Sequence, residues 1–167
     1  SKVNQDHGLS NIKLMIPFVR TVPEFRQVLA MCPAHLEVGM MCEVPSNVLL
    51  CGEFCRAGAK FMSIGSNDLA QLILGADRDS ALLSRDFDER DPAVLKAIRK
   101  VIRTCHKHAV GVSICGQMPS VYPETIQILV DAGIDGISVN PDVLEGTRRL
   151  IASAEQKFII NHIRNRK

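Results

Sequence analysis

Five short apolar runs alternate with segments of helical periodicity, and this alternation limits the fold more than any other feature of the chain. Apolar strands that alternate with amphipathic helices predict an α/β protein whose parallel sheet is covered by helices. We expect strands at 11–19, 36–42, 60–64, 110–115 and 135–139. The expected helices are 22–32, 46–57, 69–74, 92–108 and 123–132, with a terminal helix from about residue 141.

Local signals mark several of the expected helix ends. Thr21 and Glu24 have the spacing of a capping box, and Asp91 stands before a proline as a helix cap does. Gly58 and Gly133 stand where two of the helices should close. The polar connection from 75 to 90 is long for a strand–helix unit, so we expect it to be functional or to pack on a neighbour.

Length and composition fit one domain and do not indicate binding to nucleic acids or membranes. The 167 residues, 46% of them hydrophobic, can bury one core, so we expect a single domain over 1–167 with a flexible segment at 1–10. A net charge of +2, one Tyr and no Trp do not indicate nucleic-acid binding. No apolar stretch approaches the ~20 residues of a membrane span, so we expect no membrane partner and a cytoplasmic location.

The six cysteines, at 32, 42, 51, 55, 105 and 115, show no C-x-x-C pair. We therefore expect most of them to be reduced thiols that pack as small hydrophobes. Cys51 and Cys55 would share one helix face. Two thiols without further partners at ligand spacing are only a weak zinc signal.

The pattern of five strand–helix units leaves two architectures open. One is an open doubly wound sheet, and the other is five-eighths of a (β/α)₈ barrel, which usually needs ~250 residues. The absence of a G-x-G-x-x-G sequence makes a dinucleotide-binding sheet less attractive.

Polar side chains follow three of the expected strands. Glu43 follows the second run, Asn67 and Asp68 follow the third, and Cys115 ends the fourth. Because ligands in parallel α/β folds bind at the carboxyl ends of the strands, we expect these four side chains to form one shared site.

Segments 41–47 (MCEVPSN), 63–69 (SIGSNDL) and 114–117 (ICGQ) resemble, in the same order, the three motifs of the PEP-utilising enzymes. Segments 16–21 (IPFVRT), 74–80 (LGADRDS), 87–94 (FDERDPAV) and 140–142 (NPD) narrow the likeness to members that form phosphoenolpyruvate from pyruvate. The resemblance covers residues 11–150. One departure is Met118, which is bulkier than the small residue expected after the third motif.

The resemblance implies a fold and a reaction. The chain would be the C-terminal five βα units of a pyruvate-kinase-like (β/α)₈ TIM barrel, that is, a partial barrel. The parent enzyme would be a phosphotransferase with paired acceptors, acting in gluconeogenesis, that converts pyruvate, ATP and water to PEP, AMP and phosphate through a phosphohistidine. The nucleotide domain, the phosphohistidine domain and the first three barrel strands have no counterpart in this chain. The isolated chain should therefore lack full activity.

The resemblance also assigns roles to the strand-end residues. Glu43 and Asp68 would hold Mg²⁺, and Cys115 would transfer the proton of the pyruvate methyl group. Asn67 would contact the substrate. Read in isolation, the two acids fit helix caps, the amide fits a turn and the thiol fits core packing.

Four further residues are weaker candidates for contacts with an anionic substrate. Gly65 and Ser66, beside a helix N-terminus, would receive the substrate carboxylate. Arg20 and Arg78 are second-rank anion contacts, and a surface ion pair with Asp77 or Asp79 explains either of them equally well.

The expected partners are pyruvate or PEP, the absent segments of the parent enzyme, and further copies of the chain in a homo-oligomer. Two alternatives stay open. The chain could be a non-catalytic half-barrel that acts by oligomerisation through its exposed sheet edges. It could also belong to a Mg²⁺-dependent lyase or aldolase that forms a pyruvate enolate.

Overall fold

The computed structural model describes residues 8–9, 11–83 and 85–164, so most of the segment expected to be flexible lies outside it. Five parallel strands form one sheet, in the order β1-β2-β3-β4-β5. The strands are β1 (Lys13–Ile16), β2 (Glu37–Cys42), β3 (Phe61–Gly65), β4 (Gly111–Cys115) and β5 (Gly136–Ile137). The prediction of an α/β protein with a parallel sheet is confirmed.

The strand order decides between the two architectures. A doubly wound sheet reverses its order at a switch point. Here each strand pairs in parallel with the next strand in the chain, from β1 to β5, without a reversal. That sequential order is the pattern of a (β/α)₈ barrel, of which the chain supplies a contiguous part.

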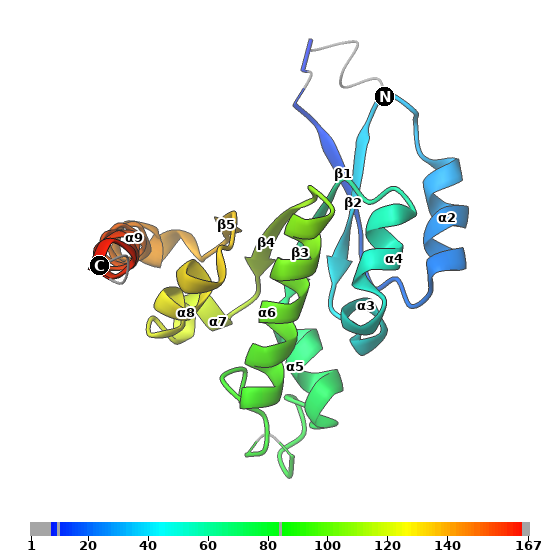
Figure 1. Ribbon diagram of the computed structural model, residues 1–167. Helices are drawn as coiled ribbons and strands as arrows, with labels where there is room; N and C mark the ends of the chain where they lie inside the picture. The colour runs from blue at the N-terminus through cyan, green and yellow to red at the C-terminus, as the bar shows by residue number, and fades with distance from the viewer. Residues whose placement is uncertain (1–7, 10, 84, 165–167) are drawn as a thin grey trace.

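The helices up to Ala132 follow the sheet in chain order and pack on one another, and the C-terminal helix packs on the helix before it (Figure 1). Their bounds are α2 (Val22–Met31), α3 (Pro45–Leu49), α4 (Cys51–Arg56), α5 (Ser66–Leu74), α6 (Pro92–Lys107), α7 (Met118–Val121), α8 (Thr125–Ala132) and α9 (Leu144–Arg164), with a 3₁₀ turn η1 (Pro141–Val143). Thr21 and Glu24 form the expected capping box on α2. Asp91 caps α6 by accepting a hydrogen bond from Ala93 N.

The core lies between the sheet and the helices. Phe25 of α2 and Phe54 of α4 are fully buried and meet edge to face, with ring centroids 6.0 Å apart. Met40, Ile64 and Ile114, one from each of the three central strands, are fully buried in this core. Burying each of these side chains contributes about 1.5–3 kcal/mol, which holds the strand ends at fixed positions.

Two expected helices differ in the structure. The single helix expected at 46–57 is two helices, because Leu50 leaves helical geometry at φ −105° and ψ 23°. Val48, Cys51 and Cys55 are buried on both sides of this break, so the helical periodicity continues across it and could not reveal it. The helix expected at 69–74 begins at Ser66 and follows β3 without a loop.

The outer strands and the α7 region also differ. The first strand ends at Ile16, because Phe18 has a positive φ of 49° that an extended strand cannot contain. The last strand has only two residues, Gly136–Ile137. The segment Met118–Val121, for which no helix was expected, forms the short helix α7.

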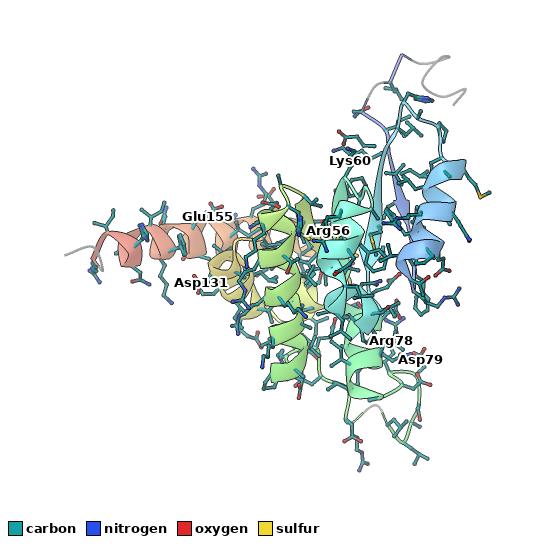
Figure 2. All side chains as sticks on the ribbon, turned by 45° about the vertical axis from the view of Figure 1, so that its right-hand side comes forward. Arg56, Lys60, Arg78, Asp79, Asp131 and Glu155 are labelled. Atoms are coloured by element: carbon teal, nitrogen blue, oxygen red, sulfur yellow. The ribbon has the colours of Figure 1, made fainter. Side chains whose placement is uncertain are left out.

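The β5 end of the sheet carries an apolar groove of about 530 Å³ between α8, β5 and α9. Phe158 and Ile159 line part of it, and the C-terminal helix α9 extends away from the sheet (Figure 2). Among the described residues, no helix combines the length and the apolar character that a membrane crossing needs.

Candidate functional site

A cavity of about 370 Å³ opens at the carboxyl ends of β2, β3 and β4. Figure 2 shows Arg78 near this end of the molecule and Lys60, which precedes β3, near the opposite end. The cavity is lined by Met41, Glu43, Gly65, Asn67, Asp68, Arg78, Cys115, Gly116, Gln117 and Asn140.

Strand register explains why residues far apart in the sequence share this cavity. Cys42 pairs with Ile64, which places Glu43 beside Gly65, and Gly65 pairs with Cys115. Adjacent strands lie about 4.8 Å apart, so the backbones of Glu43 and Cys115 are separated by two strand spacings, about 10 Å. The cavity therefore extends over three neighbouring strand ends, with Gly65 in the middle.

The Glu43 carboxylate is held in one orientation inside the protein. The residue is only 3% exposed, and its Oε1 accepts a hydrogen bond from Phe18 N at 2.7 Å. Its Oε2 faces Gly65, where a Cβ atom would lie 2.6 Å from this oxygen. Burial raises the pKa of Glu43, the Phe18 N–H group opposes that shift, and the negative charge of Asp68 adds to it.

Asn47 of α3 supports this orientation from behind. Its Oδ1 accepts hydrogen bonds from Glu43 N at 3.2 Å and Val44 N at 2.9 Å, and its Nδ2 donates to Val19 O at 2.7 Å. The side chain is fully buried. It ties the end of β2 to the segment after β1, so the backbone that carries Glu43 is fixed on both sides.

The first turn of α5 supplies the amide and the second carboxylate. Asn67 Oδ1 accepts a hydrogen bond from Gln117 N at 2.8 Å, which leaves its NH₂ group as the donor that can reach a ligand. Asp68 Oδ1 lies 4.0 Å from Arg78 Nη2, and both side chains are about 40% exposed. At that exposure the ion pair is weak, so both charges are available to a bound ligand.

The segment after Cys115 closes tightly over α5. Gly116 has φ 101°, and a Cβ atom there would lie 2.3 Å from Asn67 Oδ1 and 2.4 Å from Ser66 Oγ. The thiol of Cys115 is partly exposed in the cavity wall. Met118, the bulky departure from the family motif, is fully buried and therefore does not narrow the mouth.

Two sequence candidates lie elsewhere. Ser66 is fully buried and does not line the cavity, so only its backbone stays a candidate for substrate contact. Arg20 also lies outside the lining, and it pairs with Glu24 at 2.8 Å. The expected ion-pair partners Asp77 and Asp79 were wrong for both arginines, since Arg20 meets the capping-box acid and Arg78 meets the acid of the site.

Sequence reasoning missed Glu89 as an individual residue. It lies in the long connection yet is 2% exposed, and its carboxylate interacts with the Ser66 hydroxyl and the Met118 N–H group. Its Oε1 has no hydrogen-bond partner among the described residues. Glu89 thus joins the start of α5 to α7, the two elements that flank the Asn67–Gln117 bond. The only sequence signal was the acidic segment before the α6 cap.

Solved structures with a similar fold include a protein of Mycobacterium tuberculosis that was crystallised with magnesium. The protein CitE of Mycobacterium tuberculosis, in complex with magnesium and pyruvate, superposes with a TM-score of 0.62 at 15% identity, over 91% of this chain and 66% of that one. The complex of the same protein with magnesium and acetate gives 0.61 at 16% identity, over 88% and 63%. At these identities the likeness defines a fold class, the α/β barrel type, and no more.

The family follows from the sequence comparisons. The family model described as "PEP-utilising enzyme, PEP-binding domain" matches residues 2–156. The chain belongs to this family, which confirms the resemblance of its motifs. Similar proteins include the probable phosphoenolpyruvate synthase of Staphylothermus marinus, 50% identical over 97% of this chain, and the phosphoenolpyruvate synthase of Aeropyrum pernix, 47% identical over 97%. The chain spans only 20% and 21% of their lengths.

The buried carboxylate of Glu89 predicts a pH dependence of stability. Burial raises its pKa above the ordinary value of about 4.3, so between these two pKa values the folded chain binds more protons than the unfolded chain. Stability should therefore fall as pH rises through that range, and Glu89→Gln should remove this fall. Urea unfolding of both proteins at a series of pH values measures the difference.

Asp88→Asn is the matched control, because Asp88 should make stability change with pH in the opposite direction. A hydrogen bond from Arg90 lowers the pKa of Asp88, so its contribution is present at neutral pH and is lost on acidification. A wild-type stability that rises with pH relative to that of Glu89→Gln, over the range where Glu89 titrates, would contradict the prediction.

Gly116→Ala should disturb the site directly. The new methyl group would displace Asn67 Oδ1, and this overpacking should lower the free energy of unfolding by about 1–3 kcal/mol. The alanine backbone would also have to adopt a positive φ, which should cost about 1 kcal/mol more. Gly75→Ala is the control, because Gly75 has φ 64° but no atom within 4 Å of the added Cβ. Equal losses of unfolding free energy in the two variants would refute the close contact at Gly116.

Proposed function

We propose that this chain is the pyruvate- and PEP-binding part of a phosphoenolpyruvate synthase. The observation that carries the proposal is the single cavity in which two carboxylates, an amide, an arginine and a thiol meet at neighbouring strand ends. Family membership and the names of the relatives support the same assignment.

The residues at this cavity fit a magnesium ion. The charges of Glu43 and Asp68 are close enough for Asp68 to raise the pKa of Glu43, and Glu43 Oε2 is directed toward Gly65 at the cavity wall. Oxygen ligands from one or two carboxylates are what Mg²⁺ prefers. Glu43 and Asp68 would hold the ion, which supplies positive charge beside the oxygen that becomes negative in the enolate.

The remaining polar groups would orient a keto acid. The NH₂ group of Asn67 is directed by the Gln117 bond and would donate to a substrate oxygen. The first N–H groups of α5 have no partner within the helix, and such groups bind anions. This supports the carboxylate role predicted for Gly65 and Ser66 through the backbone. Arg78, weakly paired with Asp68, would turn to the anionic substrate when it binds.

Cys115 would move the proton of the methyl group. It lies across Gly65 from Glu43, so a three-carbon acid whose oxygens are held near the carboxylates presents its third carbon toward the thiol. A thiol near neutral pH can give and take a proton, as a reversible step requires. In the direction of PEP formation, Cys115 removes the methyl proton and the enolate oxygen becomes the phosphoryl acceptor.

The complete reaction would need parts beyond this chain. The relatives are about five times longer. We infer that the complete protein supplies the nucleotide site, the phosphohistidine and the first barrel strands, and that it uses pyruvate, ATP and water. The lyase alternative is not favoured, since the citrate lyase likeness extends to the fold alone. The cytoplasmic location and the homo-oligomer stay predictions.

Cys115→Ala in the complete protein should abolish the exchange of pyruvate methyl protons with solvent and leave ATP-dependent phosphorylation of the protein intact. The reason is that only the first process uses the thiol. Proton exchange is followed by NMR in deuterated water, with Cys32→Ser as a control outside the cavity. An unchanged exchange rate in Cys115→Ala would refute the role of the thiol.

Asp68→Asn should weaken the Mg²⁺-dependent binding of oxalate, a mimic of the enolate, by at least about tenfold, because one of two charged metal ligands is lost. Titration calorimetry with and without Mg²⁺ gives the affinities. Asp79→Asn, which removes a nearby charge outside the cavity lining, should bind oxalate as the wild type does. Equal affinity in Asp68→Asn and wild type would count against the metal assignment.

A further inference from the structure

Three cysteines outside the proposed active site meet between two helices and the sheet. Cys51 and Cys55 come from α4 and Cys105 from α6, and their three Sγ atoms all lie within 4.8 Å of one another. They are 1%, 8% and 0% exposed. The two cysteines on one helix were a weak zinc signal in the sequence, and the structure adds a third thiol that is far away in the chain.

The sulfur spacing suits a shared metal ion. Cys51 Sγ and Cys105 Sγ are 3.8 Å apart. Two thiolates that each lie about 2.3 Å from one tetrahedral or trigonal ion are separated by about 3.8–4.0 Å. A fourth sulfur atom lies next to the cluster on the side of the sheet. Met62 Sδ of β3 is 3.5 Å from Cys105 Sγ and 3.9 Å from Cys51 Sγ.

A histidine near the cluster could become a fourth ligand, although its nitrogens lie outside the group of three thiols whose sulfur atoms are within 4.8 Å of one another, so its side chain would have to move toward them. His108 follows Cys105 by one helical turn, and its Nε2 lies 3.0 Å from the position that a Cβ atom on Gly52 would occupy. Glycine inside a helix costs about 1 kcal/mol relative to alanine, and at Gly52 it gives the imidazole room over α4. His108 also lies close enough to Cys55 to lower the pKa of that thiol, after the larger effect of the Cys105 and Cys51 hydrogen bonds.

We infer that Cys51, Cys55, Cys105 and His108 form a binding site for a thiophilic divalent ion, namely Zn²⁺, separate from the proposed magnesium site. Three cysteines and one histidine are a ligand set of closed, structural zinc sites. The ion would join α4 to α6 behind β3. An ion would reach the cluster most directly beside Cys55 and His108, since Cys55 is the least buried of the three thiols and His108 is partly exposed.

The test is a metal titration of the complete protein that carries this chain, reduced with a non-thiol reductant and freed of metal. Zinc sulfate is titrated in competition with a chromophoric chelator, and Co²⁺ serves as a spectroscopic probe. We expect one zinc ion per chain, and with cobalt the sulfur-to-metal charge-transfer bands and intense visible bands of a tetrahedral thiolate site. Binding should also raise the midpoint of thermal unfolding.

Cys55→Ser should weaken zinc binding by more than the roughly 100-fold that loss of a partner outside the ligand shell can cost, and should remove the cobalt charge-transfer bands. Cys55 is chosen because, at 8% exposure, it is the least buried of the three thiols and its replacement should disturb the core least, and circular dichroism verifies the folding of the variant. Cys32→Ser, whose thiol instead lies 3.2 Å from Val28 O, is the matched control and should bind zinc normally.

Three outcomes would overturn the inference in whole or in part. Zinc affinity that is unchanged in Cys55→Ser removes the site. A Cys51–Cys105 disulfide found by mass spectrometry in freshly isolated protein shows that the thiols are a redox pair instead. Unchanged affinity in His108→Gln removes the histidine from the ligand set and leaves a site of three sulfurs.

Discussion

Parallel pairing in register brings the carboxyl ends of β2, β3 and β4 to one level, and every feature of the candidate active site depends on that alignment. Glu43, Gly65 and Cys115 stand in a row because Cys42 pairs with Ile64 and Gly65 pairs with Cys115. A slip of one residue between two strands would turn the side chains of one strand to its other face. The buried strand residues on both sides of this row therefore position the chemistry as much as they stabilise the fold.

The site places a buried carboxylate, Glu43, close to a second, partly exposed carboxylate, Asp68. Glu43 is almost fully buried, and the charge of Asp68 adds to the effect of burial on its pKa. A second buried acid, Glu89, lies behind the Asn67–Gln117 contact with one oxygen unpartnered among the described residues. Buried like charges oppose folding unless a cation or a proton neutralises them. We therefore expect a bound divalent ion to stabilise the cavity as well as to take part in the reaction.

Much of the fold could be predicted from the sequence, since its signals are local. Apolar runs gave the five strands, and the Thr21–Glu24 box and the Asp91 cap located two helix starts. The break at Leu50 could not be predicted, because the buried residues keep helical spacing across it. The burial of Glu89 and the approach of Cys105 to the other two thiols could not be predicted for another reason. Their surroundings are made by residues distant in the chain, such as Ser66 beside Glu89 and Cys51 beside Cys105, and spacing within a single segment carries no record of such neighbours.

The sequential strand order also bears on how the site assembles during folding. Each strand pairs only with its neighbours in the chain, so each pairing closes one loop and none depends on a distant terminus. Topologies dominated by short-range contacts fold faster, because the entropy of loop closure grows with the length of the loop. The longest closure is the connection between Gly65 and Gly111, which joins β3 to β4. The Cys115 half of the cavity should then be the last to dock onto the half that carries Glu43 and Asp68.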